Sequence, residues 1–109
     1  MRPRALVEHT DPYAGIATAL ALRDAGFAVA TCPGPGPAIP CPILAGGECA
    51  LAERADVIVS SLDASPDGGA VAWCLRQRLP RTPLLTDVEP DVVAARALAA
   101  IGPAQSQRL

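Results

Sequence analysis

The sequence predicts a single α/β domain, a three-layer sandwich in which helices cover both faces of a four-stranded parallel sheet with strand order 2-1-3-4. Strand-like apolar stretches alternate with stretches that have helical boundaries, which favours parallel strands joined by right-handed helical crossovers. The length of 109 residues fits one domain, since domains typically contain roughly 100–150 residues. Half of the residues are apolar and 18% are charged, so the chain can bury a core.

The first three predicted elements form a strand-helix-strand unit. Residues 5–7 read as a short strand, and Asp11-Pro12 begins a helix, because Asp is a good N-cap and Pro suits the first helical position. The helix is expected to end at Gly26, with residues 27–31 as the second strand. Its predicted apolar face contains Ile16, Ala19, Leu20 and Leu22.

The second half of the chain repeats the alternation. Residues 56–61 form the clearest strand, because their β-branched run is typical of a central strand covered on both faces. Ser65-Pro66-Asp67 begins the next helix, and residues 82–86 form a short fourth strand. Glu89-Pro90-Asp91 begins a last helix that is expected to end at Gly102-Pro103.

An insert, residues 32–49, interrupts this pattern with prolines and glycines that no helix or ladder strand tolerates. The insert is longer than the roughly two to six residues usual between such elements, and connections of that length are commonly functional. A helical turn is expected at residues 50–54. We therefore predict one domain over residues 1–103 that contains the insert, followed by a flexible tail at 104–109.

Ligands of parallel α/β sheets bind at the carboxyl ends of the strands, near the point where the strand order reverses. The sequence gathers polar residues at this rim, and we expect any activity to lie there. These residues are Glu8, His9, Thr10, Asp11, Cys32, Ser61, Asp63, Thr86 and Asp87.

The residues that frame the predicted strands resemble the receiver domain of bacterial response regulators. The similar segments are Leu6 to Asp11-Pro12, 21–29, 56–59, and Leu75-Arg76 to residues 82–85. The resemblance implies a flavodoxin-like fold. In receivers, an acidic pair after the first strand binds Mg²⁺ and an Asp ending the third strand accepts phosphate. A Ser or Thr after the fourth strand and a Lys after the fifth complete the switch.

This chain departs from the receiver pattern at most of those positions. Ser61 stands where the phosphoacceptor is expected, with Asp63 two residues later, while Asp11 and Thr86 are the nearest matches to the acidic pair and the switch hydroxyl. The chain contains no lysine, and a segment for a fifth strand and helix is missing. Because a hydroxyl cannot form an acyl phosphate, the resemblance implies a non-catalytic regulatory or protein-interaction module that has lost phosphoacceptor chemistry.

A second similarity links the chain to cobalamin-binding domains. Gly26-Phe27-Ala28-Val29 and Ser60-Ser61-Leu62 are similar to the patterns of their second and third strands. Their signature, Asp-x-His-x-x-Gly, supplies the histidine that takes the cobalt. Here His9 is followed three residues later by Pro12, and Asp11 occupies the position that fits by spacing. A corrinoid-binding-like domain is therefore a further alternative.

Three cysteines of the insert, Cys32, Cys41 and Cys49, are expected at the same rim as His9. In a cytoplasmic chain, clustered cysteines favour metal or redox chemistry over disulfides. Three thiolates and an imidazole would make a tetrahedral Cys₃His zinc site. The alternatives are a thiol-redox sensor and plain packing, because free Cys often behaves as a small buried hydrophobe. Cys74 is expected to pack in the core in this way.

Charge and hydropathy limit the partners. Nine basic residues against eleven acidic ones give a net charge of −2, which argues against a nucleic-acid binder, since such domains are usually basic. No apolar run reaches the ~18 residues of a membrane span and no signal peptide is present, so we expect a cytoplasmic protein without membrane contact. The unpaired outer edge of the fourth strand predicts a homodimer or a protein partner that docks there or on the last helix.

Overall fold

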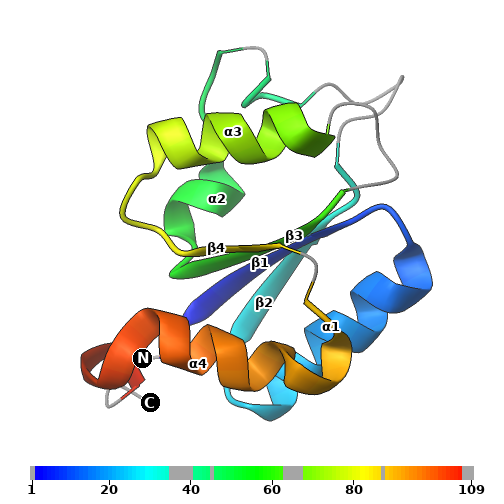
Figure 1. Cartoon of the computed structure of the whole chain (residues 1–109), viewed down its shortest axis with the longest axis vertical. Helices are drawn as coiled ribbons and strands as arrows, with labels where there is room; N and C mark the ends of the chain where they lie inside the picture. Colours follow the sequence, from blue (N-terminus) through cyan, green and yellow to red (C-terminus); the bar gives the residue numbers. More distant parts are fainter. Residues whose placement is uncertain (1, 35–40, 45, 63–67, 87, 107–109) are drawn as a thin grey trace.

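A computed structural model shows the chain as a parallel sheet between two layers of helices (Figure 1). The structure describes residues 2–34, 41–44, 46–62, 68–86 and 88–106. Its elements, in chain order, are β1 (Arg4–His9), α1 (Pro12–Asp24), β2 (Ala28–Cys32), α2 (Ala50–Arg54), β3 (Val57–Ser61), α3 (Gly68–Arg78), β4 (Leu84–Thr86) and α4 (Pro90–Ser106).

The strands form one parallel sheet with the order β2-β1-β3-β4, which confirms the predicted fold class and strand order. β1 lies in the middle, where Leu6 has Ala30 of β2 on one side and Ile58 of β3 on the other. In the part of the chain that the structure describes, β4 pairs with β3 alone and forms an outer edge of the sheet. The predicted strand limits differ from the observed ones by one or two residues.

The sheet has a hydrophobic core on each face, because successive side chains of a strand point to opposite faces. α1 and α4 lie side by side over one face, which we call the α1/α4 face, and α2 and α3 cover the other, the α2/α3 face (Figure 1). The core of the α1/α4 face includes Val7, Leu22, Phe27, Val57, Val59, Val93 and Ala97. The core of the α2/α3 face includes Leu6, Ile43, Ala52, Ile58, Leu62, Val71 and Leu75.

α1 begins and ends as its sequence predicts. The Asp11 carboxylate accepts hydrogen bonds from the backbone N–H groups of Tyr13 (3.0 Å) and Ala14 (3.4 Å), and so caps the helix. At the other end, Gly26 adopts a positive φ of 99°, and its N–H donates to the Arg23 carbonyl over 3.0 Å. This is the glycine-terminated helix end known as a Schellman motif, and it turns the chain directly into β2.

The buried face of α1 differs from the predicted one. Gly15, Thr18, Ala19 and Leu22 are buried, whereas Ile16 and Leu20 are 58% and 51% exposed. The physical reason is the close approach of the helix to the sheet at its small residues. A Cβ added at Gly15 would lie 3.2 Å from Cβ of His9, so a larger residue at this position would require the neighbouring side chain to shift by a few tenths of an ångström. The two larger aliphatic side chains therefore point away from the core.

The last elements also deviate at their ends. β4 begins at Leu84 instead of residue 82, because Pro83 accepts a hydrogen bond from Ile58 but has no N–H to donate. α4 continues to Ser106 beyond a break at Gly102, where φ is 82° and ψ is 167°. The expected helix start at residues 65–67 and the end of the expected tail, 107–109, lie outside the described residues. Within the described ranges, no helix has the length and apolar character to cross a bilayer.

Candidate functional site

A row of polar side chains crosses the α2/α3 face at the carboxyl ends of the strands. Cys32 of β2 pairs with Glu8 of β1, Glu8 pairs with Ser60 of β3, and Ser60 pairs with Thr86 of β4. Paired residues of parallel strands project from the same face, so these four side chains form one row. Glu8 and Ser60 follow the buried Leu6 and Ile58 by two residues, so the row lies on the same face of the sheet as these two side chains.

Glu8 is the most unusual member of this row. Its side chain is only 5% exposed, and the hydroxyl of Ser60 hydrogen-bonds its carboxyl group. The second carboxyl oxygen, Oε1, is buried without a hydrogen-bond partner among the residues that the structure describes. Burial raises the pKa of Glu8 above its usual value, because a buried carboxylate loses its hydration, and the bond from Ser60 opposes this change.

Cys32 follows on β2, where a tight turn partly encloses its sulfur. The backbone N–H of Gly34 donates to Sγ of Cys32 over 3.4 Å. Gly34 has a positive φ of 87°, and a Cβ there would lie 2.7 Å from Cδ2 of Leu62, so the turn requires glycine. Burial raises the pKa of the Cys32 thiol, and the nearby negative charges of Glu8 and the other two insert cysteines add to this effect. The Gly34 N–H acts in the opposite direction.

The other two cysteines of the insert flank a compact turn. The N–H of Gly47 donates to the carbonyl of Pro42 over 2.8 Å, so the chain folds back between Cys41 and Cys49. Ile43, inside this turn, is buried in the core of the α2/α3 face. All four cysteines are free thiols that pack partly buried against this same core, which confirms the predicted packing role of Cys74.

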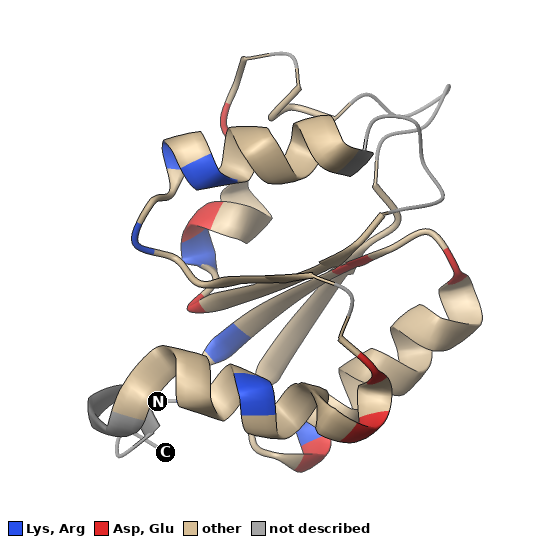
Figure 2. Cartoon of the chain, viewed as in Figure 1, with Lys and Arg blue, Asp and Glu red and all other residues tan. Residues whose placement is uncertain are grey.

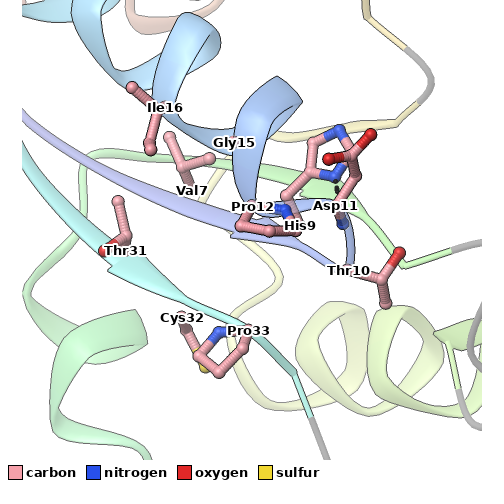
Figure 3. Close-up of a pocket in the computed structure, with 10 residues that line it drawn as sticks. All are labelled: Val7, His9, Thr10, Asp11, Pro12, Gly15, Ile16, Thr31, Cys32 and Pro33. Carbon is pink, nitrogen blue, oxygen red and sulfur yellow. Dashed lines mark hydrogen bonds between the residues drawn. The ribbon is translucent and has the colours of Figure 1, made fainter.

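His9 lies on the opposite side of the sheet from the cysteines. Because it follows Glu8 along β1, its side chain projects from the α1/α4 face. Its Nδ1 accepts a hydrogen bond from the N–H of Asp11 over 3.0 Å, and its Cβ lies against Gly15 (Figure 3). The structure therefore does not bring His9 together with Cys32 in the expected Cys₃His arrangement. Taking the described residues together, no three His, Cys, Asp or Glu side chains are already placed to hold a metal ion.

The receiver-like rim residues are also separated. Ser61 ends β3 beside His9 and is half-buried on the α1/α4 face, whereas Thr86 ends β4 and is exposed on the opposite face. Asp11 uses its carboxylate to cap α1. Asp63 lies outside the described residues, as does Asp87. The expected switch positions thus share one end of the sheet but not one face.

A cavity of about 410 Å³ lies between β1, β2 and the first turn of α1 (Figure 3). Its lining includes four residues of the rim at which the sequence predicts any activity, His9, Thr10, Asp11 and Cys32. Val7, Gly15 and Ile16 give it a mostly apolar wall. Its polar lining includes His9 and Asp11, whose side chains already hydrogen-bond backbone groups at the start of α1. Gly15 lines the cavity, and a Cβ at this position would lie 3.2 Å from Cβ of His9.

Comparisons with known proteins agree with this architecture. No family model matches the chain, and no curated protein does so significantly. Among solved structures, the chain is similar to a response regulator from Thermotoga maritima, with a TM-score of 0.56 and 17% sequence identity. The similarity covers 89% of this chain and 79% of that one. The fold is receiver-like. At this level of identity a receiver-like fold establishes the arrangement of the elements, while function depends on the residues of the site.

Proposed function

We propose that this receiver-like domain is a non-catalytic regulatory module that acts through protein contacts and does not accept phosphate. The observation that carries the proposal is Ser61 at the end of β3. In a receiver this position supplies a carboxylate, which forms a high-energy acyl phosphate. A serine hydroxyl forms a stable ester instead, so the same position cannot run that switch.

The surrounding residues support the loss of phosphotransfer. Glu8 is buried on the α2/α3 face, and Asp11 is engaged with the backbone of α1, so the two do not form an exposed acidic pair. The sequence contains no lysine to contact a phosphoryl group. These features support a receiver-like fold in which the acidic pair and the lysine needed for phosphotransfer are not available.

Exposed apolar residues on α1 support a role in protein contacts. Tyr13, Ile16 and Leu20 are 83%, 58% and 51% exposed. Their spacing places them along one side of the helix, which we call the α1 stripe. The basic residues of the described part lie in both helical layers, with several at the ends of α2 and α3 and in the loop after α3 (Figure 2), while the net charge of the chain is −2. A protein surface therefore fits this module better than a nucleic acid.

Phosphate uptake tests the proposal directly. The full chain is incubated with acetyl phosphate and Mg²⁺, and its intact mass is followed beside that of an active receiver. We expect the active receiver to gain a phosphoryl group and this chain to keep its mass. An adduct that hydroxylamine removes would identify an acyl phosphate and would refute the proposal.

The expected partner is a second copy of the chain or another protein, docked on the open edge of β4 or on α4. Light scattering across a concentration series separates the two, because a homodimer raises the mass above the 11.1 kDa of one chain. A mass that stays at one chain at high concentration rejects the homodimer.

A further inference from the structure

The insert brings three thiols to the face of the sheet that carries the buried Glu8. Cys32, Cys41 and Cys49 pack against one hydrophobic core and form no disulfide with one another. The negative charges of Glu8, Cys49 and Cys41 each raise the pKa of the Cys32 thiol, and all four residues lie on the same face of the sheet. The register brings one pair close together, since neighbouring strands place the Cα atoms of Glu8 and Cys32 about 4.8 Å apart.

The turn between Cys41 and Cys49 is fixed by a buried side chain and by hydrogen bonds. Ile43 anchors it in the core, and the Gly47–Pro42 hydrogen bond closes it. A guanidinium N–H of Arg78, on α3, donates to the carbonyl of Gly46 at the tip of the turn. The sulfur of Cys49 takes no part in capping α2. Both cysteines that flank the turn are free thiols and pack against the same core as Cys32.

Glu8 provides an independent sign that this place binds a cation. A carboxyl group that is 5% exposed and has one oxygen without a partner, among the described residues, is an incomplete arrangement. Buried polar atoms are normally hydrogen-bonded to protein or to ordered water, and buried charges are paired or bound to a metal. Thiolates and a carboxylate are both established ligands of Zn²⁺, which favours four ligands in tetrahedral geometry.

We propose that Cys32, Cys41, Cys49 and Glu8 bind one Zn²⁺ ion at the carboxyl end of the sheet, on the α2/α3 face. Glu8 takes the fourth position that the sequence alone assigned to His9, because the alternation of β1 places Glu8, and not His9, beside Cys32. The thiols, and the Glu8 carboxyl group where it is protonated, lose their protons to solvent when the ion binds. Because no such group is already assembled among the described residues, the ion must draw the thiols together when it binds.

Metal loading of the full chain under reducing conditions tests the site. Zinc content is measured per chain, and the affinity is determined by competition with a chromophoric chelator. Co²⁺ serves as a spectroscopic substitute. We expect one ion per chain, with the thiolate-to-cobalt charge-transfer bands and the visible absorption of a tetrahedral sulfur-rich site. A reduced chain that binds no metal, or an octahedral spectrum without thiolate bands, would overturn the proposal.

Cysteine variants assign the thiols. Cys32→Ser, Cys41→Ser and Cys49→Ser should each weaken zinc binding at least about tenfold, because losing even an indirect partner of a metal typically costs ten- to hundredfold in affinity. Cys74→Ser is the matched control, since Cys74 packs on the same core from α3 but does not belong to the proposed site. Equal losses in the control and the three variants would mean a packing effect and would contradict the assignment.

The choice between Glu8 and His9 needs a second pair of variants. Glu8→Gln keeps the size of the side chain and should lower zinc affinity at least about tenfold. His9→Asn, on the other face, should leave it unchanged. The reverse result would return the fourth position to His9. Circular dichroism of the metal-free variants verifies folding, and the cobalt spectrum of the unmodified chain is independent of any substitution. Neither measurement depends on the outcome of the phosphate test.

Discussion

Glu8 and Ser60 lie side by side on the two central strands, and the serine hydroxyl hydrogen-bonds a carboxyl group that is almost entirely buried. Two opposing effects meet at this contact. Burial favours the protonated carboxyl group, whereas the hydroxyl favours the carboxylate, and burial is the larger effect. In the metal-free protein, ionised Glu8 is therefore a source of instability.

Glu8→Gln is expected to stabilise the metal-free protein at neutral pH by about 1 kcal/mol, because the amide cannot ionise. Since the pKa of Glu8 is higher in the folded state than its usual value of 4.5, the folded state binds the proton more tightly. The contribution of Glu8 to stability is thus fully present below 4.5 and is lost as the pH rises through the folded-state pKa. Urea unfolding with a chelator, across this pH range, measures the difference. A wild type more stable than the variant at neutral pH would contradict the prediction.

Gly34→Ala is expected to destabilise the protein by more than strain alone. A positive φ costs an L-residue about 1–2 kcal/mol, and here the new Cβ would also meet Leu62 at 2.7 Å. Gly46→Ala is the control, because Gly46 has a similar φ of 81° but no atom within 4 Å of the added Cβ. Denaturant unfolding of both variants measures the two losses. If both variants lose the same unfolding free energy, the Leu62 side chain moves aside without an energetic cost.

Asp11→Ala is expected to cost about 1 kcal/mol in unfolding free energy, the usual value of an N-cap side chain. Asp11→Asn should cost much less, because an asparagine oxygen can accept the same bonds from Tyr13 and Ala14. Thermal unfolding of the two variants is sufficient to compare them. A loss of equal size in both would mean that the negative charge, and not the cap, is what α1 needs.

The orientation of α1 can be tested with two truncations of similar size. Leu22→Ala is expected to cost about 2–5 kcal/mol, because Leu22 is fully buried in the core of the α1/α4 face. Ile16→Ala removes an exposed side chain and should change the stability by less than about 0.5 kcal/mol. Denaturant unfolding at matched protein concentration distinguishes them. Comparable losses would place Ile16 in the core, as the sequence pattern alone suggests.

The fold was predictable because its signals are local. Asp11 before Pro12 and the glycine at position 26 bound one helix, and the β-branched run of residues 57–59 indicates a strand covered on both faces. Strand order followed from the alternation of elements together with the handedness of their crossovers. These signals depend on neighbouring residues and do not require knowledge of the register.

The site was less predictable because it depends on which face each side chain occupies. His9 and Cys32 do end adjacent strands, but strand register pairs Cys32 with Glu8, and a shift of one residue reverses the face. The buried side of α1 was also mispredicted, because hydropathy alone does not show which side of a helix packs against the sheet. Small residues such as Gly15 allow close packing that hydropathy does not record, so Ile16 looked more buried than it is.

The contact between α1 and α4 makes one of the two cores depend on the final helix. The core of the α2/α3 face contains no residue beyond Leu84 in the described part of the chain, so it takes no side chain from the final helix. The other core requires Val93 and Ala97 of the final helix. A folding intermediate that lacks the final helix would therefore leave Leu22 and Phe27 partly uncovered, and exposed apolar surface of this kind promotes aggregation.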